Sequence, residues 1–118
     1  MKKKFRLKRN EEIGKIVANK KNLKNDSYVM YYKLNKDNEN ARICISVSKK
    51  LGNAVVRNKI KRQIREIVGK TFDFSLKIDV VIVARINYLK YSFSENFEMF
   101  QKIYQLMISK EINVDEKK

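Results

Sequence analysis

The chain has 118 residues, and its 28 Lys and Arg against 13 Asp and Glu give a formal net charge of +15. This length predicts one domain with one core, which a content of 43% hydrophobic residues is enough to build. The absence of His and the single cysteine exclude His-based catalysis, His-based metal sites, internal disulfides and multi-thiolate zinc sites. No apolar run approaches the roughly 18 residues of a membrane span, so we expect a cytoplasmic protein that does not bind membranes.

The first part of the chain predicts a basic arm, a helix and a loop. Residues 1–9 form the arm. Asn10 is a candidate N-cap, because Asn is a preferred residue type at that position. The two acidic residues that follow it would interact favourably with the helix dipole in the first turn. Apolar residues then recur at helical spacing and predict a helix over about 10–19. The polar stretch 19–26 predicts a loop.

Two strands are predicted next. Aromatic and aliphatic residues dominate 27–34, which indicates one strand, or two short ones if the run splits. After a polar turn over 36–40, apolar and polar residues alternate from 41 to 48, which predicts a strand with one apolar face. Cys44 lies in this strand, and we expect it to be a buried thiol that packs as a small hydrophobe.

The second half predicts a helix, a buried strand and another helix. Gly52 and Asn53 make a tight turn before a helix over about 54–69. One stripe of that helix faces the core and consists of Val56, Ile60, Ile64 and Ile67. Continuous apolar sequence over 78–84 predicts a strand buried on both faces, and aromatic residues at helical spacing predict a core-facing helix over 93–111.

Residues 113–118 are expected to form a frayed tail. Together the elements predict an α+β fold, a two-layer α/β sandwich in which about three helices pack on a mixed sheet of three to four strands. We expect residues 1–118 to form a single domain, and the distribution of charge predicts that this domain binds RNA.

The positive charge is concentrated in two segments. Residues 1–24 hold ten bases and two acids (+8), residues 49–70 hold eight bases and one acid (+7), and the remainder is neutral. A solvated basic helix face is one interpretation of the second segment, but it explains poorly why Glu66 is the single acid there. Two concentrated positive stretches favour a polyanionic partner.

The most specific pattern spans residues 46–66, where bases at a strand end are followed by a tight turn and an Arg-rich helix start. Helix N-terminal amides and Arg side chains both bind phosphate well. This segment closely resembles the protein subunit of bacterial ribonuclease P. The matching residues are Ser46-Val47-Ser48-Lys49-Lys50, Gly52-Asn53-Ala54-Val55 and Arg57-Asn58-Lys59, together with Arg6-Leu7-Lys8 and Val83-Ala84-Arg85.

The resemblance covers roughly residues 2–86 and implies a division of labour. In that family a large RNA subunit carries out the metal-dependent endonucleolytic cleavage that generates the mature 5′ end of tRNA. The protein binds this RNA and the 5′ leader of precursor tRNA. It follows that the protein alone has no catalytic residues and binds no metal or cofactor, that Mg²⁺ is required by the ribonucleoprotein, and that the protein is a monomer in the holoenzyme.

Site residues are carried over by position. The resemblance implies that the catalytic RNA is bound by Arg57, Asn58, Lys59 and Arg62. It implies that the precursor-tRNA leader is bound by Ile13, Val17, Tyr31, Ser46, Ser48, Lys50, Lys61 and Arg65. The family often has aromatic residues where this chain has Ile13 and Val17, so these two, and Tyr31, are alternatively core residues. Lys59 replaces an Arg that is usual in the family, with loss of one bidentate donor.

Two other functions remain as alternatives. An RNA-binding protein of the ribosome or of its assembly would have the same electrostatics. A stand-alone nuclease would need carboxylates clustered around metal ions, and the acids of this sequence are scattered. Asp79 interrupts an apolar strand, and we expect it to contact solvent at the strand end or to pair with a nearby Lys.

Overall fold

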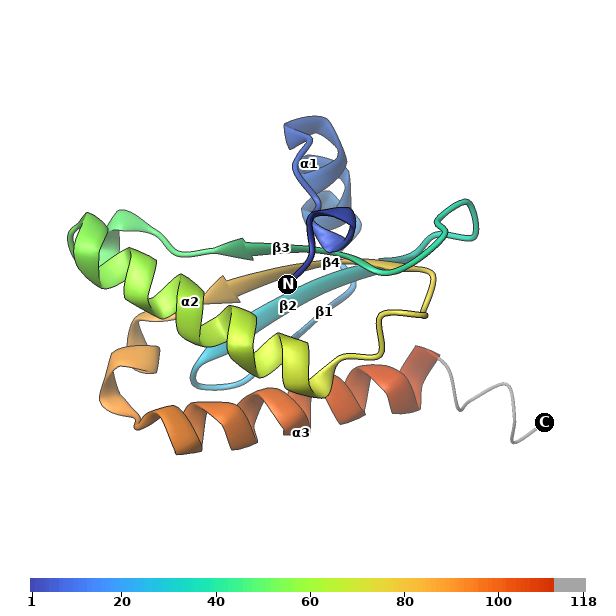
Figure 1. The fold of residues 1–118 in the computed structure, drawn as a ribbon. Coiled ribbons are helices and arrows are strands. Elements are labelled where there is room, and N and C mark those ends of the chain that lie inside the picture. Colours follow the sequence, from blue (N-terminus) through green and yellow to red (C-terminus); the bar gives the residue numbers. More distant parts are fainter. Residues whose placement is uncertain (112–118) are drawn as a thin grey trace.

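One mixed sheet with helices on both faces makes up the part of the chain that the computed structural model describes, residues 1–111 (Figure 1). The strands are β1 (Asn22–Lys24), β2 (Tyr28–Leu34), β3 (Arg42–Ser46) and β4 (Ile78–Ala84). The helices are α1 (Asn10–Ala18), α2 (Ala54–Thr71) and α3 (Phe93–Glu111), with the short 3₁₀ helices η1 (Lys3–Phe5), η2 (Lys49–Leu51) and η3 (Ile86–Lys90). The α+β class with three helices is confirmed, and the tail predicted over 113–118 lies outside the described residues.

The sheet has the order β1-β2-β4-β3. β2 pairs with β1 and with β4 in antiparallel fashion, whereas β3 runs parallel to β4, so the sheet is mixed as predicted. β4 is central, which explains why its sequence is almost continuously apolar. The register places Tyr31 of β2, Val81 of β4 and Cys44 of β3 side by side in one row across the sheet.

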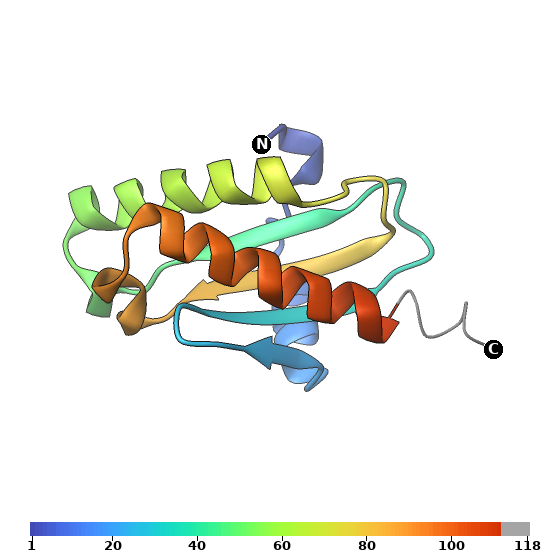
Figure 2. The same cartoon turned by 90° about the horizontal axis from the view of Figure 1, so that it is seen from below.

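The two faces of the sheet are covered differently. α2 and α3 pack together on one face, and α1 lies against β2 and β4 on the other (Figures 1 and 2). The main core lies under α2 and α3 and includes the predicted stripe residues Ile60, Ile64 and Ile67, while Val56 packs at its edge. A smaller apolar cluster lies under α1. Because α1 is short and packs mainly on β2 and β4, much of its sheet face is uncovered by helices among the described residues, and this face is called the thinly covered face.

Three local expectations were wrong. The predicted loop 19–26 contains the edge strand β1, because its three residues complete the sheet beside β2. Asn10 is the first residue of α1, and the N-cap position belongs to Arg9, whose side chain makes no capping hydrogen bond. Cys44 is only half-buried, because it faces the thinly covered side of the sheet. The run 27–34 does not split, and it forms the single strand β2.

Candidate nucleic-acid interface

A small apolar cluster joins α1 to the thinly covered face of the sheet. Leu7 of the arm, Ile16 of α1 and Val81 of β4 are buried in it, and four other side chains pack against it while remaining partly exposed. These are Ile13, Tyr31, Cys44 and Val83. Ile13 and Tyr31 therefore both contribute to packing and present part of their surface to solvent. Val17 is more open, with 39% of its surface exposed.

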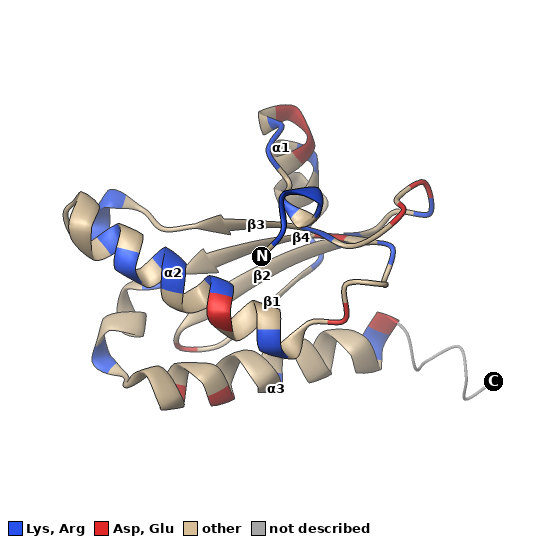
Figure 3. Ribbon diagram, viewed as in Figure 1, with Lys and Arg blue, Asp and Glu red and all other residues tan. Residues whose placement is uncertain are grey.

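The two basic segments meet beside this cluster. A hollow of about 150 Å³ is lined by Arg6 and Lys8 of the arm and by Lys61 and Arg65 of α2, together with residues of β3. No acidic residue lines it. The arm is held there because the Leu7 amide donates to the carbonyl oxygen of Ile43, 2.9 Å away. Figure 3 shows the Lys and Arg of the arm and of α2 on the same side of the molecule.

The turn from β3 into α2 is held by local hydrogen bonds. Ser48 Oγ accepts from the Lys50 amide at 3.3 Å, and Asn53 Oδ1 accepts from the Val56 amide at 3.0 Å, as expected of an N-cap. Gly52 has φ +146°, and a Cβ there would lie 2.9 Å from the Cβ of Val56. The start of α2 can therefore approach the turn closely only because residue 52 is glycine.

The predicted RNA-binding residues of α2 divide between two sides of the helix. Arg57, Lys61 and Arg65 are half-buried along one edge, and Arg57 Nε donates to the carbonyl oxygen of Gly52 at 3.2 Å. The other members of the predicted catalytic-RNA set are exposed, namely Asn58, Lys59 and Arg62. Arg57 thus lies with the predicted leader residues, and it is held by the turn rather than free in solvent.

Ser46, Ser48 and Lys50 are all exposed. The register places Ser46 beside Val83 of β4, which packs on the cluster under α1. Ser46 therefore extends the thinly covered sheet face. Ser48 and Lys50 lie beyond the end of β3, where the chain turns into η2.

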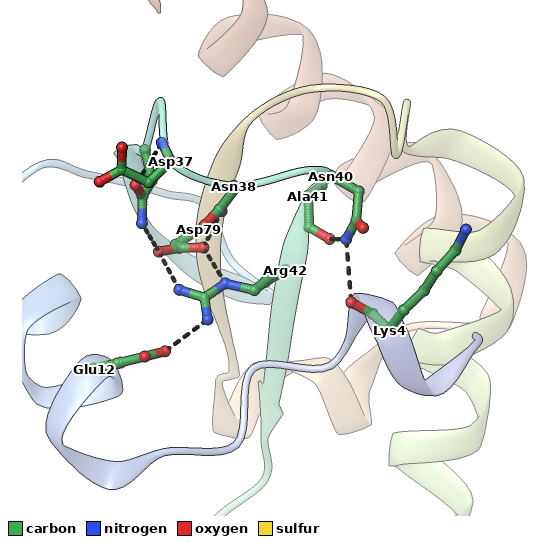
Figure 4. A network of polar contacts seen from close by, with 9 residues as sticks. Lys4, Glu12, Asp37, Asn38, Asn40, Ala41, Arg42 and Asp79 are labelled. Carbon is green, nitrogen blue, oxygen red and sulfur yellow. Dashed lines mark hydrogen bonds and ion pairs between the residues drawn. The ribbon is translucent and has the colours of Figure 1, made fainter.

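Asp79 is buried, and its predicted role was wrong. Asp79 is 3% exposed, and its carboxylate makes a bidentate pair with Arg42, with Oδ1 3.0 Å from Nε and Oδ2 3.0 Å from Nη2. Asn35 and Asn38 donate to the same carboxylate, and Arg42 Nη1 lies 2.9 Å from Glu12 of α1 (Figure 4). The partner of Asp79 is Arg42 instead of solvent or a Lys, because the parallel register of β3 and β4 places residues 42 and 79 side by side. This network connects α1 to the sheet.

The ionisable groups near the sheet face respond to burial and to their neighbours. Burial would raise the pKa of Asp79, but the hydrogen bonds from Arg42, Asn38 and Asn35 outweigh it and hold that pKa below its usual value. Burial raises the pKa of the Cys44 thiol, against the opposing effect of Lys61. Cys44 is therefore a weakly reactive thiol on this face.

The sequence pattern missed Arg6 and Lys8 as lining residues and Arg42 as the partner of Asp79. The triplet Arg6-Leu7-Lys8 did contain a signal, because a single apolar residue between two bases is typical of an extended segment with one buried side chain. Which strand that segment joins depends on tertiary structure.

Within residues 1–111, no group of three or more His, Cys, Asp or Glu could hold a metal ion. None of the helices in that part of the chain has the length and hydropathy that crossing a membrane requires.

Comparison with known proteins gives one consistent result. The family model described as Ribonuclease P matches residues 1–107. The ribonuclease P protein component of Macrococcus caseolyticus is 46% identical over 85 residues, covering 72% of this chain and 74% of that protein. That of Bacillus velezensis is 37% identical over 105 residues, covering 89% and 90%. The solved structure of the Staphylococcus aureus RNase P protein superposes with a TM-score of 0.79 at 33% identity, covering 87% of this chain and 94% of that one. The chain therefore belongs to the family of ribonuclease P protein components.

Proposed function

We propose that this protein binds two RNAs at once, the catalytic RNA of ribonuclease P and the single-stranded 5′ leader of precursor tRNA. Family membership implies an RNA partner. The observation that supports binding of the precursor-tRNA leader as well is the hollow in which Arg6 and Lys8 of the arm meet Lys61 and Arg65 of α2. It lies next to a partly exposed apolar and aromatic surface.

The leader side of the proposal rests on this combination of charge and exposed ring. Single-stranded RNA is bound by a positive groove that follows its phosphates and by aromatic faces on which bases stack. The sheet face offers Tyr31 as its aromatic group, which packs on the same cluster as Ile13 of α1. Val17 of α1 adds an exposed aliphatic side chain. With aliphatic residues on α1, the leader is held more by packing and phosphate contacts than by stacking.

The catalytic-RNA side rests on the exposed residues of α2. Asn58, Lys59 and Arg62 point away from the core, and the segment from 49 to 70 has eight bases and one acid. A second RNA can therefore occupy the outer face of α2 while the leader occupies the edge that carries Lys61 and Arg65. The protein then screens phosphate repulsion between the two RNAs.

We assign the cleavage chemistry and its divalent metal to the RNA. Membership of the ribonuclease P protein family supports this assignment. In this scheme Mg²⁺ is a requirement of the ribonucleoprotein, and the protein lowers the concentration that is needed. We expect one protein per holoenzyme.

The test is reconstitution with precursor tRNA in a Mg²⁺ series. We expect the protein alone to cleave nothing, and protein with the ribonuclease P RNA to cleave at the mature 5′ end at lower Mg²⁺ than the RNA alone. Site-specific cleavage by the protein without RNA would overturn the proposal in favour of a nuclease. Failure to stimulate the RNA, combined with binding to ribosomal RNA, would favour the ribosomal alternative.

A further inference from the structure

A second hollow, of about 250 Å³, lies between α2 and η3. Its floor contains Ile60 and Tyr88, both almost fully buried, and its rim contains Lys59, Gln63 and Leu89. Residues two apart on a helix point about 160° from each other, so Lys59 and Gln63 face away from Lys61 and Arg65. This hollow is therefore on the other side of α2 from the proposed leader site. Figures 1 and 2 both show η3 beside the start of α2.

The walls of this hollow are held in place by hydrogen bonds. The Tyr88 hydroxyl donates to Gln63 Oε1 at 2.9 Å, and the Tyr91 hydroxyl donates to Asp26. Burial raises the pKa of Tyr88 to about 12. Its hydroxyl is protonated at neutral pH, as that of any tyrosine is, and donates to Gln63. Because Gln63 Oε1 accepts from Tyr88, the Gln63 NH₂ group is turned away from Tyr88. Because these protein side chains are already held in place, binding of a ligand costs little of their conformational entropy.

Exposed hydrophobic residues lie on the two elements that form this hollow, and Leu89 lines it. Val55 at the start of α2 is 77% exposed, and Ile86 and Leu89 on η3 are 53% and 52% exposed. Single exposed hydrophobic residues are ordinary, but three at one end of the molecule beside a basic helix indicate a contact surface. The volume is below the roughly 300–1,000 Å³ of sites for drug-sized ligands, which suits one planar ring system.

We propose that this hollow receives one unpaired nucleobase of the catalytic RNA, with Tyr91 and Leu89 against its face. The proposal rests on the proposed function, because it places that RNA on the outer side of α2. RNA-binding proteins recognise splayed-out bases by aromatic contact and by hydrogen bonds to base edges. The Gln63 NH₂ group donates to an acceptor on the base edge, and Lys59 and Arg62 contact the neighbouring phosphates. The charge at this surface is thus complementary to an RNA strand.

The first experiment compares binding of the ribonuclease P RNA by Leu89→Ala, Tyr91→Ala and a matched control, Leu106→Ala. Leu106 is as exposed as Leu89, at 52%, but lies on α3. We expect Leu89→Ala and Tyr91→Ala to weaken binding by roughly 5- to 150-fold, the range for loss of one base contact. The salt dependence of log K should stay unchanged, because no charge is removed. Leu106→Ala should bind like the unmodified protein.

The second experiment places the photo-crosslinker p-benzoylphenylalanine at position 89, with position 106 as control. We expect position 89 to crosslink to one unpaired nucleotide of the ribonuclease P RNA. Unchanged binding by both Leu89→Ala and Tyr91→Ala would overturn the inference, as would crosslinks to precursor tRNA or to a second copy of the chain. If the unmodified protein does not bind the RNA at all, it is the proposed function that fails.

Discussion

Arg42 and Asp79 lie side by side on the parallel strands β3 and β4 and form a bidentate ion pair, with both N–O distances 3.0 Å. The third guanidinium nitrogen of Arg42 lies 2.9 Å from Glu12 of α1. The pair is therefore more than a sheet contact, because through Glu12 it joins α1 to the sheet, beside the apolar cluster under that helix. The proposed leader site depends on that placement.

Removing Asp79 should destabilise the fold. In Asp79→Ala the guanidinium of Arg42 loses its buried bidentate partner and keeps only Glu12, and Asn35 and Asn38 lose their acceptor. We therefore expect the free energy of unfolding to fall by about 3 kcal/mol. Urea unfolding followed by circular dichroism measures this. Glu66→Ala is the control, because it breaks only the exposed pair with Lys70 and should cost less than about 0.5 kcal/mol. Equal losses in the two variants would contradict the role given to Asp79.

The low pKa of Asp79 predicts a dependence of stability on acid. An unfolded Asp titrates at about 3.9, and the folded value lies below it, so the stabilisation is fully present above that pH. It is lost as pH falls through the folded pKa. We expect Asp79→Asn to flatten the acid limb of a plot of unfolding free energy against pH. An acid limb as steep as that of the unmodified protein would assign the effect to other carboxylates.

Loss of charge from the outer face of α2 should weaken binding of the ribonuclease P RNA in a salt-dependent way. For Arg62→Ala, we expect the slope of log K against log salt to flatten by roughly one unit for the lost phosphate contact. Lys102→Ala is the control, since Lys102 is an exposed base on α3. A slope that stays the same in Arg62→Ala would show that Arg62 is only solvated.

The basic hollow predicts variants that discriminate between substrates. Lys61→Ala and Arg65→Ala should weaken binding of precursor tRNA with a leader by roughly tenfold, and that of mature tRNA much less. Arg6→Ala should behave in the same way, because Arg6 lines the same hollow. Filter binding with both tRNAs measures this. Equal losses on the two tRNAs would remove these residues from the leader site.

Two glycines offer a matched pair of alanine substitutions. Gly52→Ala should destabilise the protein by about 2 kcal/mol, because φ is +146° and the new Cβ would lie 2.9 Å from Val56. Gly69→Ala should stabilise it by about 0.5–1 kcal/mol, because residue 69 is in α2 and nothing lies within 4 Å of its Cβ position. Thermal unfolding measures both. A tolerated Gly52→Ala would show that the turn into α2 can relax.

Local patterns predicted the three helices and three of the four strands, because their apolar residues recur with the period of a helix or strand. β1 was missed, since three residues are too few to show a period and the strand is stabilised by its partner β2. The predicted N-cap of α1 was one residue too late, because no side chain makes a capping hydrogen bond that would mark the first residue of the helix.

Residue types and local spacing were enough to predict the two positive segments, the motif that became β3, the turn and α2, and the resemblance to the family, because each depends on residues that are close together in the chain. Tertiary structure alone decided that the arm joins α2 around one hollow, that Asp79 pairs with Arg42, and that η3 forms a second hollow on the other side of α2. These relationships join residues distant in sequence, and strand register and helix packing set them. No local spacing contains that information.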